Sequence, residues 1–176
     1  MKAVFLGCTC ILSIWGFLPP NVPGEQNIQA APCPTVVTLL VTQFIFNVPI
    51  AELPRLEVRQ CGSEEELQIV AWKNKAKMPS LVIDTYDHTV VQAVARANIF
   101  VIETTGGPRD LVYVIVYRGG EPTLALKSVT KGTANVSIGE TQLNLVISGI
   151  FSGDANPRTE TYSFKLSEKD LFPKNR

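Results

Sequence analysis

The residues best suited to chemistry in this 176-residue chain form one short segment, Asp84-Thr85-Tyr86-Asp87-His88. The segment places two carboxylates, a phenol and the only imidazole of the chain side by side. Such groups can bind a metal ion weakly, and His88 could act as a general base because the ordinary pKa of imidazole is near neutrality. The same residue types are common in turns and at strand ends, so we interpret the segment as a turn.

The rest of the sequence lacks the partners that a catalytic or metal site would need. A single histidine leaves little room for zinc ligation and excludes mechanisms that use two imidazoles. No serine stands in a Gly-x-Ser-x-Gly elbow, and Gly153-Asp154-Ala155-Asn156 lacks the acidic spacing of a calcium loop. We therefore predict a protein that is not an enzyme and that has no catalytic residue, no metal site and no cofactor.

The composition indicates a folded chain with no bulk electrostatic preference. Lys and Arg number 16 against 16 Asp and Glu, and 45% of the residues are hydrophobic. A neutral chain exerts no general attraction on polyanions, and its basic residues form no stripe, which argues against binding to nucleic acid. We expect a partner to be recognised locally, with a protein or a component of the cell envelope or extracellular space as the candidates.

The N-terminus has the pattern of a secretory signal peptide. Lys2 precedes the apolar run Ala3 to Leu18, which as a helix would span about 24 Å, less than the roughly 30 Å needed to cross a bilayer. Prolines follow, and Ala30-Ala31 offers a cleavage site, with a site nearer Gly16 as the alternative. We expect residues 1–30 to be the signal peptide and its Pro-rich cleavage region. The mature protein would be secreted or periplasmic, without a stable membrane span.

Cleavage would leave two of the four cysteines, Cys33 and Cys61. In an oxidising compartment we expect them to form a disulfide, and the closed loop of about 29 residues would stabilise the fold by about 3.6 kcal/mol in the chain-entropy model. Asn135-Val136-Ser137 also matches the N-glycosylation sequon, which is used where export follows a eukaryotic secretory pathway.

Beyond the cysteine at position 33, short runs of β-prone residues alternate with turns that contain glycine. Thr35 to Phe46 is apolar on both alternating faces, which predicts a long central strand. Leu143, Leu145 and Ile147 alternate with polar residues, as expected of a strand with one face in a core. Residues 87–98 fit either a strand or one short helix, with a slight preference for the strand.

About nine or ten such strands predict an all-β fold, namely an antiparallel two-layer β-sandwich, with a small β-barrel as the alternative. We expect a single domain over residues 31–168 and a flexible tail over residues 169–176. The predicted function is that of an exported, non-enzymatic binding module acting through surface or loop contacts, in a structural, adhesive or ligand-binding role. The alternatives are a small secreted hydrolase or metal-dependent enzyme that uses Asp84 to His88, and a carrier of a small apolar ligand.

Overall fold

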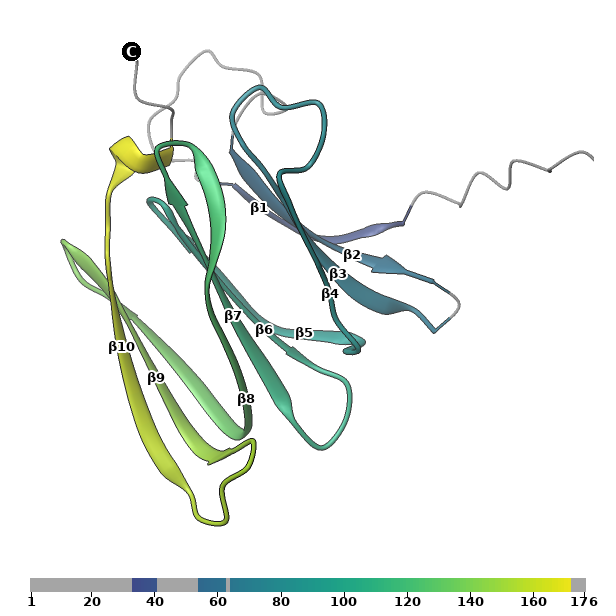
Figure 1. Cartoon of the computed structure of the whole chain (residues 1–176), viewed down its shortest axis with the longest axis vertical. Coiled ribbons are helices and arrows are strands. Elements are labelled where there is room, and N and C mark those ends of the chain that lie inside the picture. Colours follow the sequence, from purple (N-terminus) through teal and green to yellow (C-terminus); the bar gives the residue numbers. More distant parts are fainter. Residues whose placement is uncertain (1–32, 41–53, 63, 172–176) are drawn as a thin grey trace, which may run out of the picture. The chain divides into compact units, whose positions relative to one another are not determined.

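A computed structural model describes residues 33–40, 54–62 and 64–171. These residues form ten strands and one 3-10 helix, and the strands make two antiparallel sheets of four and six strands (Figure 1). The sheets pack face to face and do not close into a barrel. The predicted β-sandwich is confirmed, and the barrel alternative is wrong. The predicted signal peptide lies outside the described residues.

The four-stranded sheet has the order β1-β2-β3-β4, formed by Thr35–Leu40, Arg55–Cys61, Glu66–Trp72 and Leu81–Asp84. Leu56 and Val58 of β2 alternate with charged residues and are fully buried, as strand alternation requires. The predicted central position of the first strand is wrong. Among the described strands, β1 lies at the edge of its sheet with β2 as its one neighbour, and its described part, which ends at Leu40, is partly exposed. An apolar composition on both faces therefore did not mark a covered strand here.

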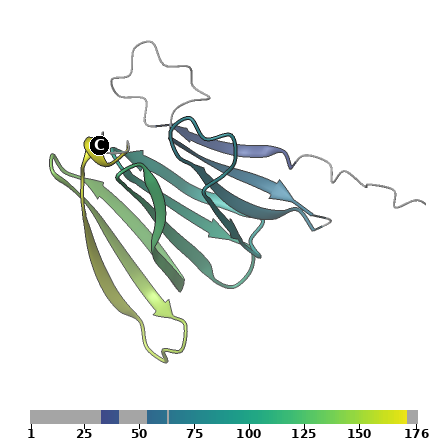
Figure 2. The ribbon, with the colours of Figure 1, turned by 45° about the horizontal axis from the view of Figure 1, so that its top comes forward.

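The six-stranded sheet has the order β10-β9-β8-β7-β6-β5 (Figure 2). Its strands in chain order are Thr89–Arg96, Ile99–Thr105, Asp110–Arg118, Glu121–Ile138, Gln142–Phe151 and Arg158–Lys165. Residues 89–96 are thus a strand, and the helix alternative for this segment is wrong. The pairing of β5 with β6 shifts between Val90 and Gln92, which marks a bulge.

Strands β6 and β7 are buried on both faces because they lie between two hydrophobic cores. Phe100, Tyr113 and Ile115 point into the first core, where they meet the inner face of the four-stranded sheet. Val101 and Val114 point the other way, into a second core that is completed by residues of β9 and β10. The six-stranded sheet therefore bends so that its last strands cover the outer face of β6 and β7.

The bend occurs in β8, an 18-residue strand. Its first part pairs with β7 as far as Thr130, and its second part pairs with β9 from Thr130 onward. Gly132 and Gly149 are direct partners just past this change, and a Cβ atom on Gly132 would lie only 1.9 Å from the carbonyl oxygen of Ser148. Glycine is required at position 132 because the two backbones approach too closely for a side chain.

The C-terminal boundary of the domain differs from the prediction. Glu168–Leu171 forms the 3-10 helix η2, and Leu171 is buried in the first core. The backbone N–H of Gly120 donates to the carbonyl of Asp170 over 2.8 Å, and Ser167 N–H donates to Asn98 Oδ1 over 2.8 Å. Residues 169–171 therefore belong to the folded domain and not to a tail, because one apolar side chain anchors them.

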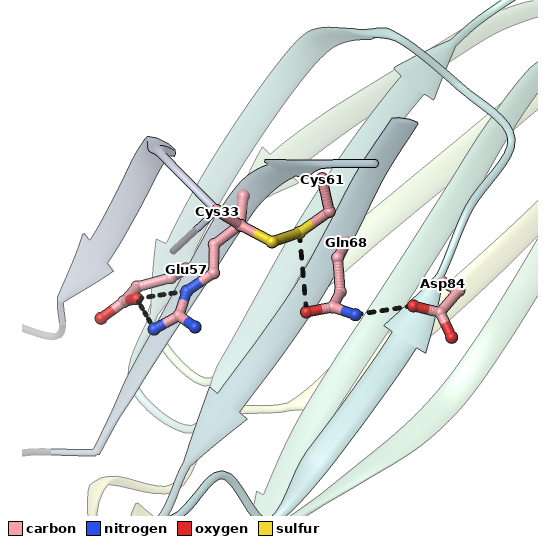
Figure 3. The surroundings of a disulfide bond; sticks show 6 residues. Cys33, Glu57, Cys61, Gln68 and Asp84 are labelled. Carbon is pink, nitrogen blue, oxygen red and sulfur yellow. Dashed lines mark hydrogen bonds and ion pairs between the residues drawn. A yellow bond between two sulfur atoms is a disulfide. The ribbon is translucent and has the colours of Figure 1, made fainter. Parts of the chain in front are cut away.

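The predicted disulfide is present between Cys33 and Cys61 (Figure 3). It joins the residues just before β1 to the last residue of β2, next to a backbone hydrogen bond of 2.9 Å from Gln60 N–H to the Pro34 carbonyl. Gln68 Oε1 lies 3.9 Å from Cys61 Sγ, a contact only, since a disulfide sulfur carries no proton to donate. The disulfide thus holds the edge strand β1 against β2 at one end.

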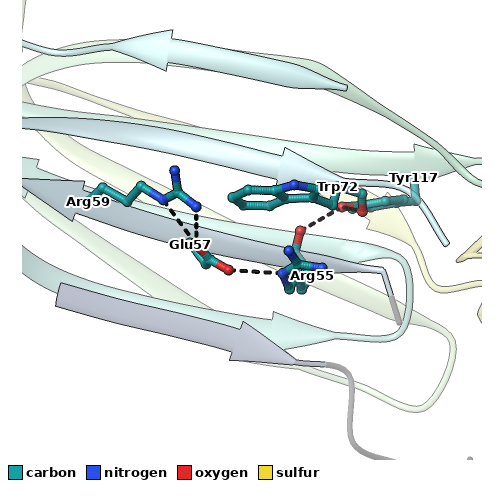
Figure 4. A network of polar contacts seen from close by, with 5 residues as sticks. All are labelled: Arg55, Glu57, Arg59, Trp72 and Tyr117. Carbon is teal, nitrogen blue, oxygen red and sulfur yellow. Dashed lines mark hydrogen bonds and ion pairs between the residues drawn. The ribbon is translucent and has the colours of Figure 1, made fainter. Parts of the chain in front are cut away.

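The two sheets are also joined by a buried tyrosine (Figure 4). Tyr117 of β7 is fully buried, and its hydroxyl lies 2.7 Å from the carbonyl of Trp72 and 3.1 Å from that of Arg55 in the four-stranded sheet. The Trp72 ring in turn lies beneath the guanidinium groups of Arg55 and Arg59, both of which pair with Glu57. Burial raises the pKa of Glu57, but the hydrogen bonds and charges of the two arginines outweigh this and lower it overall.

Candidate functional site

The Asp84 to His88 segment links the two sheets through its backbone. Thr85 N–H donates to the Leu67 carbonyl over 3.0 Å, and Leu67 N–H donates to the Asp87 carbonyl over 2.8 Å. On the other side, His88 N–H donates to the carbonyl of Thr105 in β6 over 3.1 Å. The segment is therefore a connection from β4 to β5 that is fixed to both sheets, which agrees with its interpretation as a turn.

The side chains of this segment point in different directions. Asp87 is only 4% exposed, and its carboxylate accepts a hydrogen bond from the hydroxyl of buried Thr104. His88 is exposed, and Tyr86 is 86% exposed. Asp84 accepts a hydrogen bond of 2.7 Å from Gln68. The structure therefore separates the carboxylate of Asp87 from the imidazole, and it engages Asp87 in holding the two sheets together.

A different set of polar residues converges on the outer face of β5, β6 and β7. Gln92 of β5 is the direct partner of Glu103 in β6, which in turn is the partner of Val112 in β7. Asp110 lies two residues from Val112 and so faces the same side, as the diagonal neighbour of Glu103. Diagonal positions in a sheet are about 7 Å apart, within reach of long side chains.

These residues line a cavity of about 480 Å³ beside the bend of β8, together with Val91, Gly132, Thr133, Ala134 and Asn135. Glu103 is 6% exposed and accepts a hydrogen bond from the backbone N–H of Ala134. Burial raises the pKa of Glu103, and the nearby charge of Asp110 raises it further. A buried carboxylate beside a second carboxylate in the wall of an open cavity is, among the described residues, the arrangement most typical of a functional site.

Sequence reasoning missed this site, although one signal was available. Glu103 has the same strand parity as Ile99 and Val101, so it is a charged residue at a core-facing position in an otherwise apolar run. Glu103 forms a site only together with Gln92, Asp110 and Asn135, which line the same cavity and come from three other strands. Their convergence follows from the register of β5 to β8, which the sequence does not specify.

A second cavity, of about 620 Å³, lies at the other end of the β6–β7 pair. Val116 and Phe164 give it an apolar part, and Arg118, Lys165 and Asp170 contribute charged groups. Asn98 stands beside it and is held by hydrogen bonds to the Tyr117 carbonyl and from Ser167. The two cavities therefore lie at opposite ends of the β6–β7 pair, and two carboxylates line the first whereas two cations and one carboxylate line the second.

The remaining sequence candidates are placed as follows. Asn135 and Ser137 of the sequon are both exposed on β8, and Asn135 lines the cavity beside Glu103. Asp154, from the turn considered for calcium, pairs with Arg158. Over residues 33–40, 54–62 and 64–171, no group of three or more His, Cys, Asp and Glu side chains could hold a metal ion. Within the same ranges no helix is long and apolar enough to cross a membrane.

The chain was compared with models of protein families, with curated proteins and with solved structures, and no match was found.

Proposed function

We propose that this protein is an exported β-sandwich that acts as a binding module and does not catalyse a reaction. The observation that carries the proposal is the cavity at Glu103, where carboxyl, amide and hydroxyl groups from four strands face an opening of about 480 Å³. That volume is within the usual range for sites that bind small molecules. Rigid strands hold these groups, and such a scaffold favours specific binding.

The geometry of the Asp84 to His88 segment also supports a non-enzymatic role. A hydrolase that used this segment would need the Asp87 carboxylate and the His88 imidazole to face one another at a cleft. Asp87 is instead buried against Thr104, while His88 lies in solvent. Export as part of the proposal is supported by the apolar N-terminal run in the sequence and by the Cys33–Cys61 disulfide, which is typical of oxidising compartments.

A ligand screen tests the binding role. Thermal unfolding of the purified protein would be followed with separate sets of amines, polyols, carboxylates and fatty acids, and hits would be mapped by ¹⁵N NMR. We expect at least one class to raise the melting temperature and to shift amides around a cavity, with the ligand recovered unchanged. Conversion of a ligand to product that is lost in Glu103→Gln or His88→Ala would refute the proposal.

Export is tested by expressing the whole chain in a host with a secretory pathway. The expected product outside the cytoplasm begins near Ala31, and its intact mass differs by two hydrogens between non-reducing and reducing conditions. Retention of the full chain in the cytoplasm, with free thiols at Cys33 and Cys61, would contradict this part of the proposal.

A further inference from the structure

We infer that the cavity beside the bend of β8 binds an organic cation through Glu103 and Asp110, by pairing a primary amine or guanidinium group with the two carboxylates. This inference rests on the proposed binding function and adds the chemical class of the ligand. The ligand could be a free amine or the side chain of a basic residue in a partner, because both present the same N–H donors.

The position of Glu103 is the first step of the argument. Only 6% of the surface of Glu103 is exposed, yet the residue lines the cavity. Its carboxylate accepts one hydrogen bond from the backbone of Ala134, whereas a carboxylate can accept about four. Acceptor capacity therefore remains on a carboxylate that burial has already partly desolvated.

The second step is the charge around Glu103. Among the described residues, Asp110 is the one other ionisable group that lines the cavity, and its charge has the same sign. Two neighbouring carboxylates, one of them buried, raise the free energy of the unliganded site when both are ionised. A cation placed between them removes this repulsion and supplies hydrogen bonds to the buried carboxylate, so the charges of the site favour a positively charged ligand.

The third step separates an organic cation from a metal ion. Calcium takes six to eight oxygen ligands in a compact shell. Glu103 and Asp110 occupy diagonal positions of the sheet, and the other polar side chains are the amides of Gln92 and Asn135 and the hydroxyl of Thr133, distributed around about 480 Å³. Such a wide site suits a ligand with several N–H donors and an apolar body, which would contact Val91 and Ala134.

Isothermal titration with agmatine, which carries an amine and a guanidinium group, tests the inference. We expect saturable binding to the wild-type protein and a loss in affinity of about ten- to a hundredfold for Glu103→Gln and for Asp110→Asn, since hydrogen bonds to charged groups contribute at this level. Glu140→Gln is the matched control, because Glu140 is exposed in the turn between β8 and β9, outside the cavity. Its affinity should equal that of the wild type.

Three further ligands sharpen the test. 1,4-Butanediol, an uncharged molecule with the same four-carbon chain, should not bind. Calcium chloride should weaken agmatine binding no more than sodium chloride of the same ionic strength does. Acetyl-arginine amide represents the side chain of a partner: tighter binding of this compound than of agmatine indicates a protein ligand, and the reverse order indicates a free amine. ¹⁵N NMR of the wild type should show shifts at Glu103 and Ala134 on addition of agmatine, which does not depend on the folding of any variant.

Absence of agmatine binding, equal affinity in Glu103→Gln, or displacement by calcium at equal concentration would overturn the inference. If a neutral or anionic compound from the ligand screen binds while agmatine does not, the cationic class is wrong and the binding module stands. If no compound of any class binds, both proposals fail.

Discussion

Two buried tyrosines on β7 provide a matched test of how the sheets are held together. Tyr117 and Tyr113 are both fully buried and both face the first core. The hydroxyl of Tyr117 lies 2.7 Å from the Trp72 carbonyl in the opposite sheet, whereas the hydroxyl of Tyr113 makes no hydrogen bond to the described residues. The two Phe variants remove the same atom from the same strand and differ in what that atom contacts.

We expect Tyr117→Phe to lower the free energy of unfolding by about 1 to 2 kcal/mol, because it removes a buried hydrogen bond and leaves a carbonyl without its partner. Tyr113→Phe should be neutral or slightly stabilising, because it removes a buried polar atom that gains no hydrogen bond in the fold. Burial raises the pKa of both phenols, that of Tyr113 to about 12 with a smaller contribution from Asp87, so both are neutral at ordinary pH. Ionisation therefore does not complicate the comparison.

Urea unfolding at neutral pH, followed by tryptophan fluorescence, measures both differences. For a domain of this size the loss in Tyr117→Phe corresponds to a decrease of about 2 to 8 °C in melting temperature. Equal destabilisation by the two variants would refute the reasoning, because Tyr113 would then have a hydrogen-bond partner as important as that of Tyr117. A neutral Tyr117→Phe would show that the hydroxyl does not tie the sheets together.

Three other perturbations have defined outcomes. Replacing both Cys33 and Cys61 by Ser should cost about 3.6 kcal/mol in urea unfolding, given a sequence separation of 28, and a cost below about 1 kcal/mol would show that the unfolded chain is not restrained by this loop. Gly132→Ala should destabilise the protein by about 3 kcal/mol or prevent folding, because its Cβ atom would meet the backbone of Ser148. Gly107→Ala is the control and should be tolerated, because a Cβ atom there meets nothing within 4 Å. Equal effects of the two substitutions would refute the close approach of the backbones at Gly132. The pKa of Glu103 is raised in the folded protein, so the wild type loses stability as the pH rises from the unfolded pKa, near 4, through the folded pKa. In urea unfolding at a series of pH values, Glu103→Gln should therefore gain stability relative to the wild type between about pH 4 and neutrality. A constant difference over that range would contradict the raised pKa.

The sequence was sufficient to predict the fold class because strand alternation reports which side chains are covered. Leu143, Leu145 and Ile147 were expected to share a core face, and all three are fully buried. Cys33 and Cys61 were expected to pair because they are the two cysteines beyond the predicted cleavage site, and they do. These features depend on local pattern or on simple counting, and both can be read without knowing which strands are neighbours.

Features that depend on strand order could not be predicted. Thr35 to Leu40 reads as a covered strand but lies at a sheet edge, since apolar composition does not reveal how many neighbours a strand has. Leu171 looks like part of a polar tail, yet its single side chain brings η2 into the first core. Glu103 pairs with Gln92 and has Asp110 as its diagonal neighbour because of the register across three strands, and this register determines the position of the candidate site.

The bend in β8 has a consequence for how the chain reaches its native state. Because β9 and β10 supply one wall of the second core, β6 and β7 keep a bare apolar side until almost the entire sequence is available. A polypeptide synthesised from its N-terminal end onward would then remain incompletely folded until its last strands emerge. By the same logic, fragments that stop before Gln142 should self-associate through that uncovered side.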